Sequence, residues 1–301
     1  PAGLDRMVLH GSGRLGAITD DTQMALFTME GLIRSRGVPV PAAVHAAHRR
    51  WYATQLLPGP PGGDGPQRRP LAREAWLYAR RAPGNACLSG LRTEAMGTLD
   101  RPANPNSKGC GAVMRSAPFG LVPAWSPEEA FDLAAECGAQ THGHPTGHLA
   151  AGAFAAIVRR LVGGMDLTEA VSRTLEQTGS RPGGHETQAA LTAALEAAGE
   201  TGDPTPERLE RLGAGWVAEE ALAMSVYCAL AHPGDVRSAL LLAVNHSGDS
   251  DSTGAITGNL LGAWRGDRSL PAPWVTALEG REAMEALTAD FVAFAEGRPA
   301  E

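Results

Sequence analysis

Two short acidic stretches, far apart in the sequence, carry the side chains best suited to hold a metal ion. They are Thr19-Asp20-Asp21-Thr22 and Asp249-Ser250-Asp251-Ser252-Thr253. Carboxylate and hydroxyl oxygens suit Mg²⁺, Mn²⁺ or Ca²⁺ better than zinc. Four carboxylates would repel one another unless divalent ions neutralised them, and such ions can also activate a water molecule. If the two stretches meet in the fold, they predict a metal-dependent hydrolytic site.

Each stretch also has a simpler interpretation. Acids and hydroxyls are common at helix N-termini, so the first stretch could be only a helix cap. The second stretch, with Gly254 after it, copies the first six positions of a calcium-binding EF-hand loop. Leu260 stands where that loop needs a bidentate glutamate, which excludes the EF-hand.

The segments that follow the two stretches favour their burial. Residues 23–33 are apolar on nearly every face, as in a helix inside a core. Gly254, Gly258 and Gly262 form a stripe without side chains, along which another helix could approach closely. We therefore expect both helix starts in the interior of the protein.

The rest of the chain predicts an all-α protein with a single domain over residues 1–301. Ala- and Leu-rich stretches alternate with Gly and Pro, and few segments show the pattern of strands. A surface loop is expected at 58–70, because Gly and Pro dominate its first half. Helices are expected at 21–36, 41–57, 71–81, 127–140, 145–163, 167–178, 186–199, 206–232, 235–245, 253–264 and 281–296.

Composition narrows the partners and the compartment. The formal net charge is −7, so no general attraction to nucleic acid or to anionic membranes is expected. No apolar run is long enough to span a membrane, and the N-terminus lacks a signal-peptide pattern. Four cysteines without a C-x-x-C pair predict reduced thiols in a cytoplasmic protein, which we expect to be a monomer.

Three further motifs allow alternatives. Gly11–Gly16 matches G-x-G-x-x-G, but the adjacent carboxylates would repel a dinucleotide, which disfavours that reading. The histidines at 142, 144 and 148 could bind zinc, although hydrogen-bonded structural roles are favoured. The loop 104–118 could cradle an anion with its backbone amides, assisted by Lys108 or Arg115. The simpler interpretation is an ordinary loop with Arg115 in a salt bridge.

Four motifs, taken in order, resemble those of the ADP-ribosylglycohydrolase family. They are Thr19-Asp20-Asp21-Thr22, Asn106-Ser107-x-Gly109-Cys110-Gly111-Ala112-x-Met114-Arg115, Thr141-His142-x-His144-Pro145 and Gly248-Asp249-Ser250-Asp251-Ser252-Thr253-Gly254. The resemblance spans about residues 14 to 264. It implies a compact all-α fold around a central site with two Mg²⁺ or Mn²⁺ ions. It also implies hydrolysis of the bond between ADP-ribose and a protein side chain, with arginine slightly preferred over serine.

The same resemblance assigns site residues. The implied metal ligands are Thr19, Asp20, Asp21, Asp249, Asp251 and Ser252. The implied contacts to ADP-ribose are Asn106, Ser107, Gly109, Cys110, Gly111, Met114 and His142. Asp21 and Asp251 are the candidates to polarise the attacking water.

One departure from the family pattern motivates alternatives. Family members usually begin with a G-D-A-x-G-like motif and a nearby acidic residue, and nothing before Gly16 matches it. We therefore expect that this N-terminal segment is missing from the chain or has diverged. A catalytically weak protein that binds ADP-ribose or a nucleotide is one alternative. A hydrolase of small conjugates such as acetylated ADP-ribose is another.

Overall fold

The computed structural model describes residues 4–8, 13–61 and 71–298, and it confirms the predicted all-α class. Within these residues there is no strand, although an isolated antiparallel bridge joins Gly109 to Val217. Most of the loop expected at 58–70 falls in residues 62–70, outside the described residues. Residues 9–12, which include the start of the glycine motif, also lie outside them.

The described residues form fourteen α-helices and five short 3₁₀ segments. The α-helices are α1 (Asp20–Ile33), α2 (Val40–Thr54), α3 (Asn85–Gly90), α4 (Ala117–Gly120), α5 (Pro127–Ala139), α6 (Pro145–Val162), α7 (Leu167–Gly179), α8 (His185–Gly199), α9 (Pro206–Leu209), α10 (Ala218–Ala231), α11 (Val236–Val244), α12 (Ser250–Arg265), α13 (Ala272–Ala277) and α14 (Arg281–Ala295). The 3₁₀ segments are Leu71–Arg73, Ala75–Tyr78, Cys110–Ala112, Glu210–Leu212 and Asp267–Ser269.

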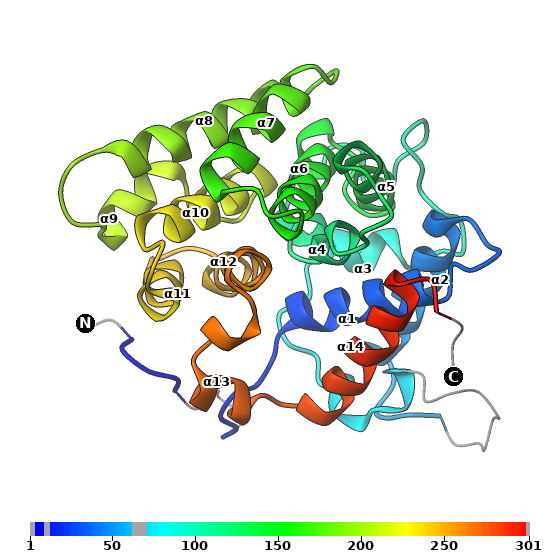
Figure 1. The fold of residues 1–301 in the computed structure, drawn as a ribbon. Coiled ribbons are helices and arrows are strands. Elements are labelled where there is room, and N and C mark those ends of the chain that lie inside the picture. The colour runs from blue at the N-terminus through cyan, green and yellow to red at the C-terminus, as the bar shows by residue number, and fades with distance from the viewer. Residues whose placement is uncertain (1–3, 9–12, 62–70, 299–301) are drawn as a thin grey trace.

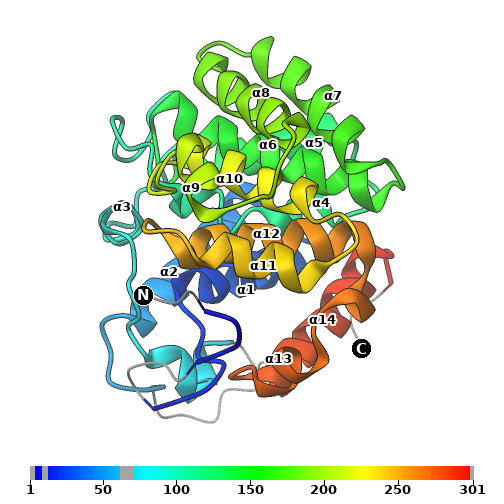
Figure 2. The same ribbon diagram turned by 90° about the vertical axis from the view of Figure 1, so that its left-hand side faces the viewer.

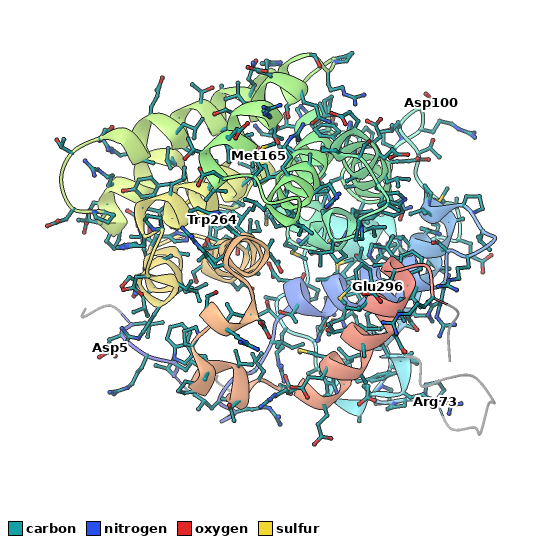
Figure 3. The ribbon with its side chains drawn as sticks, viewed as in Figure 1. Asp5, Arg73, Asp100, Met165, Trp264 and Glu296 are labelled. Carbon is teal, nitrogen blue, oxygen red and sulfur yellow. The ribbon has the colours of Figure 1, made fainter. Side chains whose placement is uncertain are left out.

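Three clusters of buried apolar side chains hold the helices together. The largest joins α6, α7, α8, α10, α11 and α12, and Met165 and Trp264, labelled in Figure 3, pack against it. A second cluster lies around Phe27 of α1 and Trp51 of α2. A third links α2, α4 and α5 to Phe291 of α14. The contacts between clusters give one continuous helical body, in which α7 and α8 lie far from α13 and α14 (Figure 1).

The two helices that begin at the acidic stretches lie beside each other in the middle of this body. Figure 2 shows α12 and α11 in front of α1. Both helices are anchored by apolar side chains, Met24 and Phe27 in α1 and Ile256 and Leu260 in α12, and all four are fully buried. Part of the expected glycine stripe does allow a close approach. A Cβ atom on Gly254 would lie 2.9 Å from a methyl group of Val244 in α11, whereas one on Gly262 would meet nothing within 4 Å.

Two expected helices are corrected by the structure. The helix expected at 206–232 is divided into α9, a 3₁₀ turn and α10. Gly213 and Gly215 have φ angles of 134° and 78°, which other residues rarely adopt, so they break the helix. The segment 71–81 forms two 3₁₀ segments followed by extended residues. The short helices α3, α4 and α13 were not anticipated, since none exceeds six residues.

The start of α5 is a capping box formed by Ser126 and Glu129. The Ser126 side chain accepts from the Glu129 amide, and the Glu129 side chain accepts from the Ser126 amide, so two of the unpaired amides at the start of α5 are satisfied. In the part of the chain that the structure describes, no helix has the length and apolar character needed to cross a membrane.

Candidate metal centre and cavity

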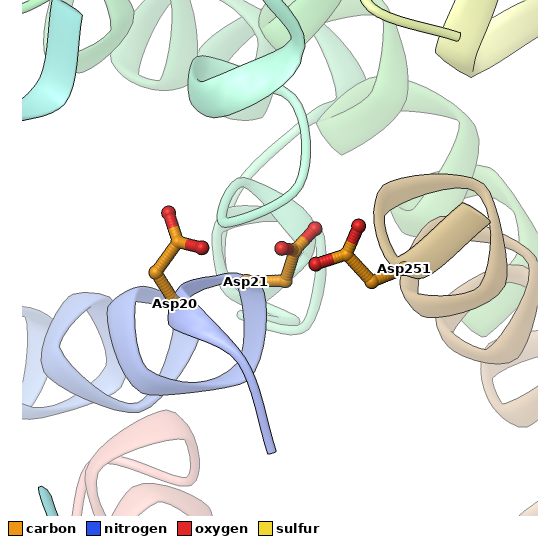
Figure 4. Close-up of side chains that lie close together, drawn as sticks. All are labelled: Asp20, Asp21 and Asp251. Atoms are coloured by element: carbon orange, nitrogen blue, oxygen red, sulfur yellow. The ribbon is translucent and has the colours of Figure 1, made fainter. Parts of the chain in front are cut away.

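The N-termini of α1 and α12 bring three carboxylates together. Asp20 and Asp21 occupy the first turn of α1, and Asp251 lies in the first turn of α12. Each offers one oxygen, and these oxygens all lie within 4.8 Å of one another. Figure 4 shows Asp21 facing Asp251 across the gap between the two helices. The expected meeting of the two acidic stretches is thus present, although 230 residues separate Asp21 from Asp251 in the sequence.

The interpretation of the first stretch as only a helix cap is wrong. Thr19 is the N-cap residue of α1, but its side chain makes no capping bond and donates instead to Oδ2 of Asp21 at 3.1 Å. Asp249 is the N-cap residue of α12, and its carboxylate likewise caps no backbone amide. It accepts from the thiol of Cys110 at 2.9 Å. Asp249 lines the cavity between the helices, and Thr19 is tied to it through Asp21.

Burial and mutual repulsion make the carboxylates costly to ionise together. Burial, with the charges of Asp251 and Asp249 adding to it, raises the pKa of Asp20 to about 7. Burial also raises the pKa of Asp21 well above its ordinary value, and the charges of Asp251 and Asp20 raise it further. Burial is again the main reason that the pKa of Asp249 rises to about 6. Such a group of acids is stabilised by a positive ligand.

The donor set fits a hard divalent cation. Oδ1 of Asp21 is buried and has no hydrogen-bond partner, which leaves its lone pairs free for an ion. The neighbouring carboxylates of Asp20 and Asp251 add further oxygens. Asp251 is the most exposed of the three. Asp20, Asp21 and Asp251 therefore form an acidic triad that could hold a metal ion.

A cavity of about 440 Å³ lies over the triad. This volume is within the usual range for a small-molecule site. Its wall includes glycines, whose backbone is accessible, and the indole of Trp216, which is 61% exposed. The lining residues are Asp20, Asp21, Ala82, Gly84, Asn85, Ala86, Gly109, Cys110, Gly111, Met114, His142, Trp216, Gly248, Asp249, Ser250, Asp251 and Ser252.

The start of α12 is positioned by the loop before α10. The Asp249 amide donates to the Ala214 carbonyl at 2.8 Å. Gly248 allows this approach, because a Cβ atom on it would lie only 1.9 Å from the Ala214 oxygen. The glycine-rich loop that divides α9 from α10 therefore has a structural purpose, since it brings both Asp249 and Trp216 to the cavity.

The start of α1 is held by a partly buried ion pair between Arg81 and Glu279. The backbone carbonyl of Arg81 accepts from the Asp20 amide. The guanidinium of Arg81 donates to the Ile18 carbonyl at 2.8 Å. Glu279, only 3% exposed, accepts from Arg81 and from the Ile18 amide. Arg14, which is largely exposed, adds an outer contact to Glu279 at 3.5 Å.

Most residues assigned by the motifs gather at the cavity, and three do not. Thr19 reaches it only through its hydrogen bond to Asp21. Asn106 is exposed and lines no described cavity. Ser107 lines a shallower groove that shares Asn85 and Ala86 with the central cavity.

Lys108 and Arg115, which could assist anion binding in the 104–118 loop, do not line the cavity. Lys108 forms ion pairs with Glu186 and Glu219, which tie its loop to α8 and α10. Arg115 is buried, and among the described residues it forms no salt bridge, so the ordinary-loop interpretation is also wrong on this point. The interpretation of the histidines as hydrogen-bonded groups is confirmed for two of them. Nδ1 of His142 pairs with the Thr141 hydroxyl, and the His144 side chain accepts from the amide of Thr146.

Several lining residues were not found from the sequence. Trp216 was placed inside a helix, although the glycines before it signal a turn. Asn85 and Ala86 follow Pro83-Gly84, a dipeptide that is typical of turns but carries no signal of a binding site. Ala82 lines the cavity with a φ of 52°, an unusual conformation for a residue other than glycine.

The structure thus combines an all-helical fold with a cavity whose wall carries three carboxylates from two helix N-termini. Proteins of this class could hold a metal ion beside a small molecule. The chain belongs to the ADP-ribosylglycohydrolase family, whose sequence profile matches residues 1–300. It is 25% identical over 209 residues to an ADP-ribosyl-[dinitrogen reductase] glycohydrolase of Rhodospirillum rubrum. This alignment covers 68% of the chain and 63% of that protein, so it spans less than two thirds of the relative's length.

A solved structure supports the same assignment. It is described as an ADP-ribosylglycohydrolase-related protein complex, and it superposes with a TM-score of 0.66 at 26% sequence identity. The match covers 93% of this chain and 83% of that one. The resemblance inferred from the four motifs is thereby confirmed at the level of family and fold.

Proposed function

We propose that this protein hydrolyses the glycosidic bond between ADP-ribose and a modified protein side chain, arginine in preference to serine, and releases ADP-ribose. The partnerless Oδ1 of Asp21, buried in an acidic triad at the base of a cavity, is the observation that carries the proposal. Such an oxygen is suited to a cation and is costly without one. Family membership supplies the substrate class.

Two Mg²⁺ or Mn²⁺ ions are the proposed cofactors. Their ligands would be Thr19, Asp20, Asp21, Asp249, Asp251 and Ser252. When bound, they would neutralise the carboxylates, orient ribose hydroxyls and acidify a water molecule. Cys110, Met114 and the glycines at 109 and 111 would contact ADP-ribose, since all four line the cavity.

Asp21 and Asp251 are the proposed groups that orient the attacking water and accept its proton. Their carboxylates face each other from α1 and α12 (Figure 4), and both residues line the cavity in which the anomeric carbon would lie. Cleavage at that carbon develops positive charge on the sugar ring, and nearby carboxylates stabilise it electrostatically.

The test is turnover of defined peptides. Arginine- and serine-ADP-ribosylated peptides are incubated with the protein in Mg²⁺, Mn²⁺ or EDTA, and free ADP-ribose is measured by chromatography. Metal-dependent release, abolished in Asp20→Ala and Asp251→Ala variants that stay folded, is the expected result. Binding of ADP-ribose without release from any peptide would remove the proposed activity and favour a binding protein. Release of acetate from acetylated ADP-ribose alone would favour a hydrolase of small conjugates.

A further inference from the structure

Arg115 is a fully buried guanidinium for which the described residues supply no carboxylate partner. Its Nη1 group contacts the sulfur atoms of Met24 and Cys87 at 3.6 and 3.5 Å. Its Nη2 group donates to the hydroxyl of Thr141 at 2.7 Å, the shortest of its contacts. A buried cation is costly, so its one short hydrogen bond is the strongest interaction it makes.

The Thr141 hydroxyl connects this cation to His142. Its oxygen lies 2.8 Å from Nδ1 of the imidazole. Arginine can only donate, so Thr141 accepts from Arg115 and retains one proton to give. Thr141 is fully buried, and Nδ1 of His142 is the acceptor that the described residues place within its reach. Nδ1 therefore accepts, and the proton of the neutral ring is on Nε2.

The imidazole is held in its neutral form. Burial lowers the pKa of His142 to about 3, and the charge of Arg115 lowers it further in the same direction. Near neutral pH the ring carries a single N–H group, and Nδ1 is already occupied by Thr141. His142 is therefore a fixed hydrogen-bond donor and is unsuited to act as a general base.

The donor end of the ring lies beside the glycine turn that forms part of the cavity wall. His142 is among its lining residues, and Nε2 lies against the two glycines of the 109–111 turn. A Cβ atom on Gly111 would lie 3.1 Å from Nε2, and one on Gly109 would lie 3.4 Å from it. The absence of side chains at both positions leaves the Nε2 edge open beside the turn.

We propose that Arg115 and Thr141 are positioning residues that fix the Nε2–H tautomer of His142, and that this N–H group donates to a phosphate oxygen of the ligand. The buried positive charge at the far end of the chain of hydrogen bonds favours an anionic acceptor over a neutral one. The phosphate assignment rests on the proposed function, whereas the tautomer assignment concerns the protein alone.

Histidine-selective ¹⁵N labelling tests the tautomer without any ligand. Long-range ¹H–¹⁵N correlation spectra show which ring nitrogen carries the proton, and His142→Gln identifies the signals of this residue. Wild type and Thr141→Ser should both show Nε2–H. Thr141→Val, which can neither accept from Arg115 nor donate to Nδ1, should lose this single tautomer.

A matched control exists in α7. Thr178 is also a fully buried threonine, and its hydroxyl donates only to the Thr174 carbonyl, so Thr178→Val should leave the His142 spectrum unchanged. Nδ1–H in the wild type, or an unaltered His142 spectrum in Thr141→Val, would overturn the assignment. The wild-type spectrum is decisive even if the valine variant fails to fold.

ADP-ribose, added with Mg²⁺, tests the phosphate contact. Binding should shift the His142 Nε2–H proton resonance, and Thr141→Val should bind ADP-ribose about tenfold more weakly while Thr178→Val binds normally. Binding that leaves the His142 resonances unmoved would overturn the phosphate assignment. Failure of the wild type to bind ADP-ribose at all would remove the proposed function and, with it, the phosphate contact, while the tautomer would stand on its own spectra.

Discussion

The thiol of Cys110 donates a hydrogen bond to Oδ2 of Asp249, with sulfur and oxygen 2.9 Å apart. Cys110 lies in the turn that lines one wall of the cavity, and Asp249 precedes α12 on another. The Ser252 hydroxyl completes the contact by donating to the sulfur at 3.5 Å. This short chain of hydrogen bonds fixes the orientation of Asp249 and leaves its second oxygen for other partners.

The first prediction concerns this thiol. Cys110→Ala removes the donor, so the pKa of Asp249, already about 6, should rise further and the carboxylate should be less ionised at pH 7. Loss of one such hydrogen bond is worth about 1 kcal/mol, so Mn²⁺ affinity measured by calorimetry at pH 7 should fall about fivefold. Cys110→Ser keeps a donor and should bind nearly as the wild type does. Equal affinities in all three proteins would contradict the prediction.

The second prediction concerns the pH dependence of stability in EDTA. The folded pKa of Asp20, about 7, lies above the ordinary value of 3.8, so between these values the folded state binds more protons. Ionisation of Asp20 therefore lowers the free energy of unfolding as pH rises from about 4 through about 7. Asp20→Asn, which stays neutral, should be more stable than wild type at pH 8 by on the order of 2–4 kcal/mol, with little difference at pH 4.

Denaturant unfolding of wild type and Asp20→Asn in EDTA at several pH values measures this stability difference. Asp290→Asn, a change at an exposed carboxylate on α14, is the control and should show no such divergence. Mn²⁺ should stabilise the wild type at pH 8 and not Asp20→Asn, because the amide replaces a proposed ligand. A wild type that is the more stable of the two in EDTA at pH 8 would refute the argument.

The sequence was sufficient to predict the fold class and the meeting of the two acidic stretches. Long helices with buried faces have a strong periodic signal in the sequence. Acidic side chains at the start of such helices are drawn into the interior, where they need partners. The four motifs then identified the family. The tertiary contacts that orient the carboxylates, such as Cys110 with Asp249, have no local signal, because the partners are 139 residues apart.

Two expectations that the structure corrects also have physical causes. The turn at Gly213–Gly215 was merged into a helix because alanine and leucine on both sides outweigh two glycines in a periodic pattern. The simpler interpretation of the 104–118 loop placed Arg115 in a salt bridge, and a buried arginine usually has a carboxylate partner. Its actual partner is a neutral hydroxyl, which depends on the packing of α5 against the 110–116 turn.

The third prediction concerns Trp216 at the rim of the cavity. Its indole is 61% exposed although it lines the cavity, which suits a surface on which a nucleobase stacks. Stacking of one base is worth about 1–3 kcal/mol, so Trp216→Ala should weaken ADP-ribose binding about tenfold. Trp216→Phe keeps an aromatic ring and should lose much less. If the alanine variant binds ADP-ribose like the wild type, Trp216 has no part in binding.

The last prediction concerns the pair of Arg81 and Glu279, which holds the residues just before α1. The Arg81 side chain donates to the Ile18 carbonyl, and the Arg81 carbonyl accepts from the Asp20 amide. Glu279, in the segment between α13 and α14, accepts from the Arg81 guanidinium and so orients it. The Glu279 side chain is buried and the Arg81 side chain is largely covered, at 4% and 11% exposure. Breaking a buried pair strands a charge at a cost of about 3 kcal/mol, so Glu279→Gln should lower the free energy of unfolding by about that amount.

Arg14→Ala is the matched control, because Arg14 contacts the same carboxylate from the surface with 51% of its side chain exposed. An exposed contact of this kind is worth less than about 1 kcal/mol. Glu279→Gln should also weaken Mn²⁺ binding severalfold in calorimetry under conditions where it remains folded, since Asp20 depends on the held segment. If Glu279→Gln were destabilised while its Mn²⁺ affinity stayed at the wild-type value, the pair would stabilise the fold without positioning the metal ligands. A loss of both stability and Mn²⁺ affinity in Glu279→Gln, with neither loss in Arg14→Ala, is the outcome that links the C-terminal helices to the acidic triad.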